Sequence, residues 1–235
     1  MKFLRLGLLA TTVFSTIFSF AQTAEEIVAK HIDAIGGKDK IAGIKSIYME
    51  TSSQIMGNDA PGTATILNGK GFKSETEFNG SKMIQAYNET GGWSTNPMGG
   101  GTPEAMPDEQ YKAGKSQMQI GGELVDYAAK GSKIELAGKD GNLYKIKLTN
   151  KDNSQTTYFI DPSTYYITKL VKSGEVMGQQ VDITMSFSDY KKTDYGYVLA
   201  YSTQLEFGTM FSMTMAIKKV EVNKDVDPKI FEMPK

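Results

Sequence analysis

Few residues in this chain are of the types that carry out chemistry. Its 235 residues include one histidine, His31, and no cysteine. A zinc site built from Cys and His needs several such ligands, and a Ser-His-Asp triad needs a histidine beside a nucleophile motif. His31 lies on the apolar stripe of a predicted helix, where a histidine is more often packed or hydrogen-bonded than catalytic. We therefore predict no metal, no cofactor and no histidine-based mechanism.

The carboxylates give no clearer signal for catalysis. With 27 acidic residues, counting alone does not exclude a glycosidase that uses paired carboxylates. The sequence DVDP at 225–228 lacks the ligand spacing of a calcium loop, which favours a solvated turn before Phe231. The GGG at 99–101 is not followed by the Lys-Ser/Thr of a phosphate loop, which favours a flexible hinge. We predict that the protein is not an enzyme.

Three segments near the C-terminus show alternating large apolar and small or polar side chains, the period of a half-buried strand. They span 181–190, 197–207 and 210–222, and their apolar members are Val181, Ile183, Met185, Phe187, Tyr197, Leu199, Tyr201, Leu205, Phe207, Phe211, Met213, Met215 and Ile217. Alternation alone favours an ordinary hydrophobic core. The methionines favour instead a surface that repacks around variable apolar guests, because their stems are unbranched and flexible.

The elements that must position this face are mostly strands. We expect a first helix between the Thr23–Glu26 capping box and the stop at Gly36–Gly37, and a short turn at 39–44. Further helical segments are expected at 108–118, with Asp108 as the cap, and at 123–130. The strands are expected at 46–53, 63–67, 72–78, 82–87, around Trp93, 133–137, 143–149, 156–160, 165–171, 181–190, 197–207 and 210–222. Because helices and strands do not alternate, we predict a mainly β fold, one large curved antiparallel sheet whose concave face the helices cover.

The first residues resemble an export signal. Lys2 and Arg5 precede an apolar run at 6–20, and small residues at Ser19 and Ala21 fit a cleavage site. We expect residues 1–21 to be removed after Ala21, leaving one domain, 22–235, in the periplasm. Removal would leave 24 lysines, no arginine and 27 acidic residues, a net charge of −3 (24 − 27). Such a chain shows no electrostatic footprint for nucleic acid.

Several segments resemble the LolA-like outer-membrane lipoprotein-sorting proteins. They are AEEIVAKHIDAIGGKDKIAGIKSI, YNETGGWSTNP, YFIDPSTYYITKL, FSDYKKTDYGYVLAYSTQLEFG and KKVEVNKDVDPKIFEMP, in that order. The resemblance implies an unclosed antiparallel β-barrel of about eleven strands with a helical lid and a hydrophobic cavity that shields lipoprotein acyl chains. In these carriers an inner-membrane ABC transporter loads the cavity and an outer-membrane acceptor empties it. The family holds its lid with an arginine on an early strand, whereas this chain has Lys73 in that segment.

Together the pattern and the resemblance predict a carrier that binds the acyl chain of a lipoprotein or another apolar ligand. The alternative is an envelope sensor or adaptor that uses the same fold to contact a protein partner. The predicted cavity lining is Ile183, Met185, Phe187, Leu199, Tyr201, Phe211, Met213, Met215 and Trp93. The predicted lid residues are Ile27, Ile32, Leu124 and Tyr127.

Overall fold

The computed structural model of the chain describes residues 22–55, 57–95, 100–176 and 179–234. The predicted export signal and its cleavage site, and Gly99 of the predicted hinge, lie outside these residues. Within them, no helix is both long and apolar enough to cross a membrane.

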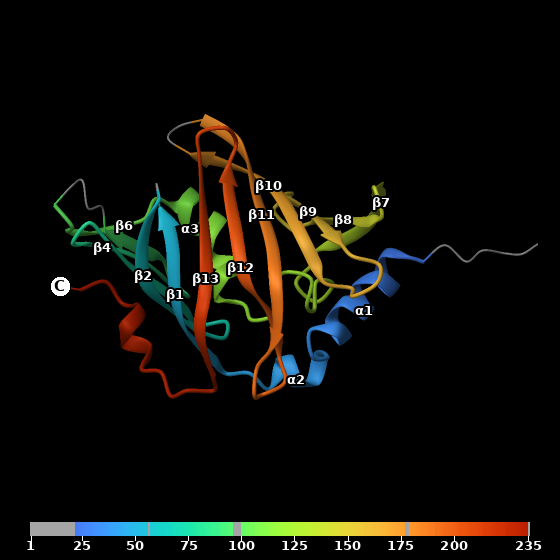
Figure 1. Cartoon of the computed structure of the whole chain (residues 1–235), viewed down its shortest axis with the longest axis horizontal. Helices are drawn as coiled ribbons and strands as arrows, with labels where there is room; N and C mark the ends of the chain where they lie inside the picture. Colours follow the sequence, from blue (N-terminus) through green and yellow to red (C-terminus); the bar gives the residue numbers. More distant parts are fainter. Residues whose placement is uncertain (1–21, 56, 96–99, 177–178, 235) are drawn as a thin grey trace, which may run out of the picture.

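One antiparallel sheet of thirteen strands makes up most of the molecule (Figure 1). The strands are β1 (Ser46–Ile55), β2 (Asn58–Leu67), β3 (Gly71–Phe78), β4 (Ser81–Asn88), β5 (Gly92–Thr95), β6 (Pro103–Ala105), β7 (Lys133–Asp140), β8 (Leu143–Thr149), β9 (Gln155–Ile160), β10 (Ile167–Val176), β11 (Gln179–Lys192), β12 (Val198–Phe207) and β13 (Phe211–Val222). Their order is β6-β5-β4-β3-β2-β1-β13-β12-β11-β10-β9-β8-β7, so β6 and β7 are edges and the sheet does not close. The predicted fold class is confirmed, with thirteen strands in place of about eleven.

Short turns connect most neighbouring strands, and their sequences explain the register. Asn79 and Gly80 both have positive φ, 52° and 75°, between the paired residues Phe78 and Ser81. Asn-Gly is the preferred loop of a two-residue hairpin because both residues adopt this backbone region at little cost. The exception to the meander is the pairing of β1 with β13, which joins the two halves of the chain in the middle of the sheet.

Helices are short and lie against the sheet rather than within it. They are α1 (Ala24–Ala34), α2 (Lys38–Ala42), α3 (Asp108–Gly114) and the 3₁₀ turns η2 (Lys115–Met118) and η3 (Pro228–Phe231). The capping box of Thr23 and Glu26 is formed as predicted. Asp108 is the first residue of α3 rather than its cap, which is Pro107.

Two local expectations were wrong. Residues 123–130 form consecutive turns instead of a helix, because Gly121, Gly122 and Asp126 have positive φ (85°, 78° and 51°), which a continuous helix does not accommodate. No strand was expected in the Gly- and Pro-rich stretch that contains β6. Its three residues pair with β5 at the edge of the sheet, where a proline is tolerated.

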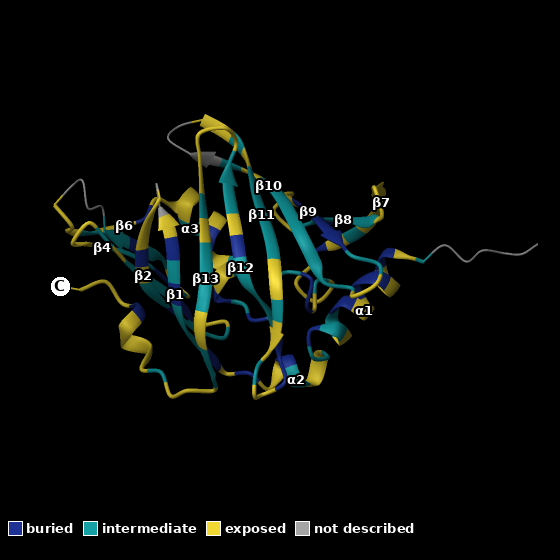
Figure 2. Cartoon of the chain, in the orientation of Figure 1, coloured by how far each residue is buried: buried dark blue, intermediate teal, exposed yellow. Residues whose placement is uncertain are grey.

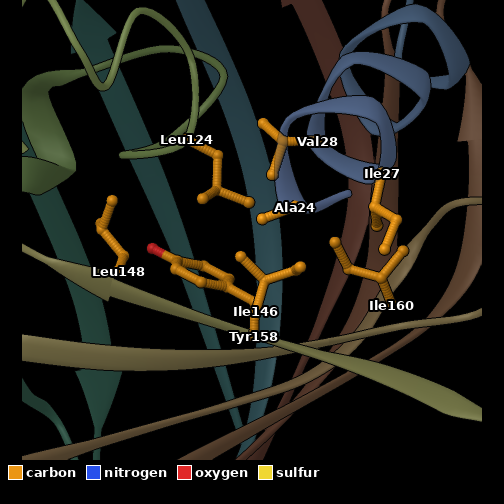
Figure 3. Packing of buried hydrophobic residues seen from close by; sticks show 8 residues of the cluster. All are labelled: Ala24, Ile27, Val28, Leu124, Ile146, Leu148, Tyr158 and Ile160. Atoms are coloured by element: carbon orange, nitrogen blue, oxygen red, sulfur yellow. The ribbon is translucent and has the colours of Figure 1, made fainter. Parts of the chain in front are cut away.

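Three buried clusters hold the covering segments against the sheet. The first joins α1 and Leu124 to strands β8 and β9, and Figure 3 shows these side chains pointing toward one another. The second contains Ile35, Ile41, Ile44, Ile47, Ile120, Val125 and Tyr197. The third contains Ala64, Phe72, Tyr87, Met106 and Met118. The covering layer, consisting of α1, α2 and residues 106–131, is therefore fixed by burial of its apolar residues.

Candidate apolar binding face

Strand pairing places eight apolar side chains together on one face of β11, β12 and β13. Residues directly opposite one another on paired strands share a face of the sheet. The cross-strand rows run Ile183–Phe207–Phe211, Met185–Leu205–Met213 and Phe187–Thr203–Met215. We call this set the apolar strip: Ile183, Met185, Phe187, Leu205, Phe207, Phe211, Met213 and Met215.

We call the face of the sheet that carries the covering layer the concave face, and the other the convex face. The apolar strip lies on the concave face. Met215 pairs with Ser53 of β1, and alternation along β1 places Met49 and Ile47 on the same face. Ile47 belongs to the second buried cluster, beneath α2 and Ile120, and Met49 packs against it. The covering layer and the apolar strip therefore share one face.

None of the eight side chains is fully buried. Seven are of intermediate exposure, and Phe211 is 43% exposed. They belong to none of the three buried clusters. Figure 2 shows β11–β13 coloured mainly as intermediate and exposed along their length. The rings of Phe207 and Phe211 stack on each other with centroids 4.3 Å apart, so a large aromatic surface lies at one end of the strip.

The structure separates two predicted lining residues, Leu199 and Trp93, from the strip. Leu199 packs against the second buried cluster, so it belongs to the core. Tyr201 lies on the same face as the strip by the alternation of β12. It is half-buried, and the ammonium of Lys191 lies 4.8 Å from the centroid of its ring.

Trp93 lies on the opposite face of the sheet, which contradicts its expected place beside the methionines. Tyr87, which belongs to the third buried cluster on the concave face, pairs with Gly92, so the next residue, Trp93, projects from the convex face. There its indole Nε1 donates to the carbonyl of Phe231 at 2.9 Å. Phe231 is 1% exposed and also lies against Gly71. Trp93 therefore anchors the C-terminal turn η3.

The four predicted lid residues come together at one end of the sheet. Ile27 and Leu124 are fully buried in the first cluster, and Ile32 and Tyr127 pack against it. The structure thus groups them over β8 and β9, beside the apolar strip rather than on it. Their role as a lid that opens remains a prediction.

Glu123 links the covering layer to the sheet by three hydrogen bonds. The carboxylate of Glu123 accepts from the hydroxyl of Tyr158 at 3.0 Å, from that of Thr156 at 3.4 Å and from the amide of Asn150 at 3.2 Å. Burial, followed by the charge of Glu123, raises the pKa of Tyr158 well above its usual value. Lys73, the cation considered for holding the lid, projects from the convex face and pairs with Glu75 at 2.6 Å.

The two hollows described on the surface lie away from the strip. One, of about 340 Å³, is lined by Ser74, Thr76, Met83, Ile84, Gln85, Ser94 and Thr95. The other, of about 400 Å³, is lined by Ser81, Lys82, Ile84, Thr95, Gly100 and Gly101. Both are open, and their walls expose polar and apolar atoms in about equal amounts. The side chains of the apolar strip are half-exposed, and the hydrophobic cavity that the resemblance implies remains a prediction.

His31 is buried and has a structural contact. It is 3% exposed, and its Nδ1 lies 2.8 Å from the carbonyl oxygen of Tyr165, to which it donates. Burial lowers the pKa of His31 below its ordinary value, and the bond to the Tyr165 carbonyl opposes this only partly. Among the described residues, no group of three or more His, Cys, Asp or Glu is arranged to hold a metal ion.

The predicted cavity lining omitted three residues of the concave face: Leu205, Phe207 and Lys172. Leu205 and Phe207 followed the alternation of β12 and complete the rows of the strip. Lys172 lies one residue beyond the predicted end of its strand, whose observed span, β10, reaches Val176. Lys172 could have been found from the sequence, because it follows Leu170 by two residues and so falls on the same face if the strand continues past residue 171.

Comparison with known proteins supports the fold and leaves the sequence family open. No protein-family model matches the chain, and no curated protein matches it significantly. Solved structures do match. One is a putative outer membrane lipoprotein-sorting protein domain from Vibrio parahaemolyticus, with a TM-score of 0.58 and 14% identity over 88% of this chain and 97% of that one.

Two further structures match with similar quality. A LolA superfamily protein from Nitrosomonas europaea has a TM-score of 0.59 and 12% identity, and a DUF1329 family protein from Desulfovibrio piger has a TM-score of 0.59 and 14% identity. Each alignment covers 90% of this chain and 98% of the other. At such low identity the likeness concerns the backbone architecture. The thirteen-stranded open sheet with its covering helices is a LolA-like fold.

Proposed function

We propose that this protein is an exported, periplasmic binding or carrier protein that holds the acyl chain of a lipoprotein, or another apolar ligand, against the apolar strip. The observation that carries the proposal is the strip itself: three adjacent strands present apolar side chains in register, half-exposed and outside every buried cluster. Soluble proteins seldom expose large contiguous apolar patches unless these bind something. Two structures of the same fold bear names that refer to lipoprotein sorting or the LolA superfamily.

The role proposed is non-enzymatic. Each methylene group of an acyl chain contributes about 0.8 kcal/mol when it is buried, so a long chain gains a gross stabilisation on the order of 10 kcal/mol. Ordering of the ligand and the loss of its free motion reduce this to an ordinary, reversible affinity. Met185, Met213 and Met215 suit such a role because their flexible side chains adjust to the ligand's shape. Loading by an inner-membrane transporter and delivery to an outer-membrane acceptor complete the proposal.

The test compares two faces of one strand. Met213 and Thr214 are consecutive in β13, so Met213 faces the strip and Thr214, which is exposed, faces away. We expect delipidated protein to take up a fluorescent fatty-acid probe at one site. Met213→Asp should weaken uptake at least about tenfold because it places a charge among apolar side chains. Thr214→Asp should leave uptake unchanged.

Circular dichroism confirms that each variant is folded before titration. Saturable uptake that depends on Met213 but not on Thr214 supports the proposal. Absence of saturable uptake, or equal loss in both variants, overturns it. Native mass spectrometry of gently purified protein provides an independent readout, since a carrier is expected to retain a bound lipid or acyl peptide.

A further inference from the structure

Lys172 of β10 lies on the concave face at the end of the apolar strip. It pairs with Ile183 of β11 on one side and with Thr156 of β9 on the other. Because Ile183 begins one row of the strip, Lys172 shares its face. Leu170, two residues earlier in β10, lies on the same face as Lys172 and packs against the first buried cluster, so Lys172 also faces the covering layer. Lys169, of opposite parity, projects from the convex face and lies 3.9 Å from the ring centroid of Phe159.

The ammonium of Lys172 has a weak protein partner. Its Nζ donates to the carbonyl oxygen of Ala113, in α3, at 3.5 Å. Among the side chains that the structure describes, no carboxylate lies within 4.0 Å of it. An ammonium has three donors, so the remaining N–H groups are available to an acceptor.

The side chains paired with this cation are uncharged, and the carboxylate of Glu123 lies over the same face, where it accepts hydrogen bonds from Thr156 and Tyr158. The directly paired residues are Thr156 and Ile183, and the diagonal neighbours include Tyr158 and Met185. A cation next to apolar surface is stabilised by an anion that shares its partly dehydrated setting.

The rows of the strip give the ligand a direction. From Lys172 the first row continues through Ile183 and Phe207 to Phe211, one residue on each of four adjacent strands. Three interstrand spacings of about 4.8 Å make this row about 14 Å long. The stacked rings of Phe207 and Phe211 lie at its far end. A charge at one end of an apolar row matches an amphiphile with one anionic head and one hydrocarbon chain.

We propose that the concave face binds an anionic single-chain amphiphile, whose carboxylate or phosphate pairs with Lys172 while its chain lies along the apolar strip toward Phe207 and Phe211. This inference rests on the proposed function and makes it more specific. If the strip alone bound the ligand, the affinity would not depend on the head group. Pairing with Lys172 selects an anion over a neutral or cationic head.

The experiment titrates the delipidated full chain with four probes of equal chain length, below their micelle-forming concentrations, by calorimetry. They are dodecanoate, dodecyl phosphate, dodecanol and dodecyltrimethylammonium. We expect the anions to bind about tenfold or more tightly than dodecanol, and the cation to bind most weakly. The tighter of the two anions identifies carboxylate or phosphate as the preferred head.

Variants separate the head-group contact from the strip. Lys172→Met should reduce the affinity for the anions about tenfold and leave that for dodecanol unchanged, whereas Lys172→Arg should retain the preference for anions. Lys218→Met is the matched control, because it removes an exposed lysine of β13 and changes the net charge equally. It should preserve every affinity.

The outcomes distinguish this inference from the proposed function. If all probes bind equally, or if Lys172→Met weakens anions and dodecanol alike, the inference is overturned while the apolar binding site stands. If Lys218→Met lowers anion affinity as much as Lys172→Met, a general charge effect replaces the specific contact. If no probe binds, both proposals are overturned.

Discussion

At the scale of single residues, burial decides the role of the chain's one histidine. His31 is a buried residue of α1, and its imidazole donates to the carbonyl of Tyr165 in the turn that precedes β10. Tyr165 itself has a positive φ of 56°, and its hydroxyl is hydrogen-bonded by Gln22 and Lys30. This arrangement fastens the N-terminal helix to the sheet.

The lowered pKa of His31 predicts a pH dependence of stability. The unfolded chain takes up a proton near the ordinary histidine pKa of about 6.5, while the folded chain does so only at lower pH. The unfolded state therefore binds more protons as the pH falls, and the free energy of unfolding should decrease between about pH 7 and pH 5. Urea denaturation across this range measures the slope. His31→Gln should flatten it, and an unchanged slope would show that another group is responsible.

At the scale of elements, the C-terminal turn η3 closes the convex face near β3 and β5. The ring of Phe231 occupies the space above Gly71, where a Cβ atom would meet it. The same residue accepts a hydrogen bond from Trp93 through its carbonyl. Phe231 is thus positioned by two residues: Gly71 leaves room for its ring, and the indole of Trp93 binds its carbonyl.

Gly71→Ala tests this packing. The added methyl group displaces the Phe231 ring, and we expect a loss of about 1–3 kcal/mol in the free energy of unfolding, the usual range for overpacking. Trp93 is the single tryptophan of the chain, so its fluorescence should shift to the red as η3 loosens. Gly91→Ala is the control, because a Cβ there meets nothing within 4 Å. Equal stability and emission in the two variants would contradict the assigned role of η3.

At the scale of the whole molecule, the covering layer occupies part of the concave face and leaves the strip half-exposed. Three buried clusters fix the layer over β8 and β9, over the middle of the sheet and over β3 and β4. Hydrogen bonds at Glu123 add a polar link between the layer and β9. The division between covered core and open face is therefore set by where residues 106–131 and the first helices pack.

Removal of the Glu123 carboxylate should loosen this layer. Glu123→Ala leaves the buried hydroxyl of Tyr158 without its acceptor, at a cost of about 1–3 kcal/mol. Amide hydrogen exchange should accelerate across residues 119–131 while β11–β13 remain protected. The control, Asp126→Asn, removes only a solvent-exposed pair with Lys38 and should change stability by less than about 0.5 kcal/mol. Unchanged exchange in Glu123→Ala would show that apolar packing alone holds the layer.

The sequence by itself determined most strands, the first helix and the antiparallel class of the fold. These depend on local signals: the Thr23–Glu26 box, the Asn79–Gly80 turn and the alternation within β11 to β13. It failed at 123–130, where left-handed residues interrupt a pattern that looked helical, and at β6, whose three residues owe their strand form to pairing with β5. Such pairing is not encoded within the segment itself.

Only the tertiary structure decided which side chains share a face and what covers them. Trp93 was expected to line the cavity with the methionines, yet it follows Gly92, the partner of Tyr87, by one residue and therefore projects from the convex face. Leu199 and Leu205 alternate identically along β12, but Leu199 packs against the buried core while Leu205 remains in the open strip. Alternation specifies that a face is apolar. Whether that face becomes core or binding surface depends on the distant segments that pack against it.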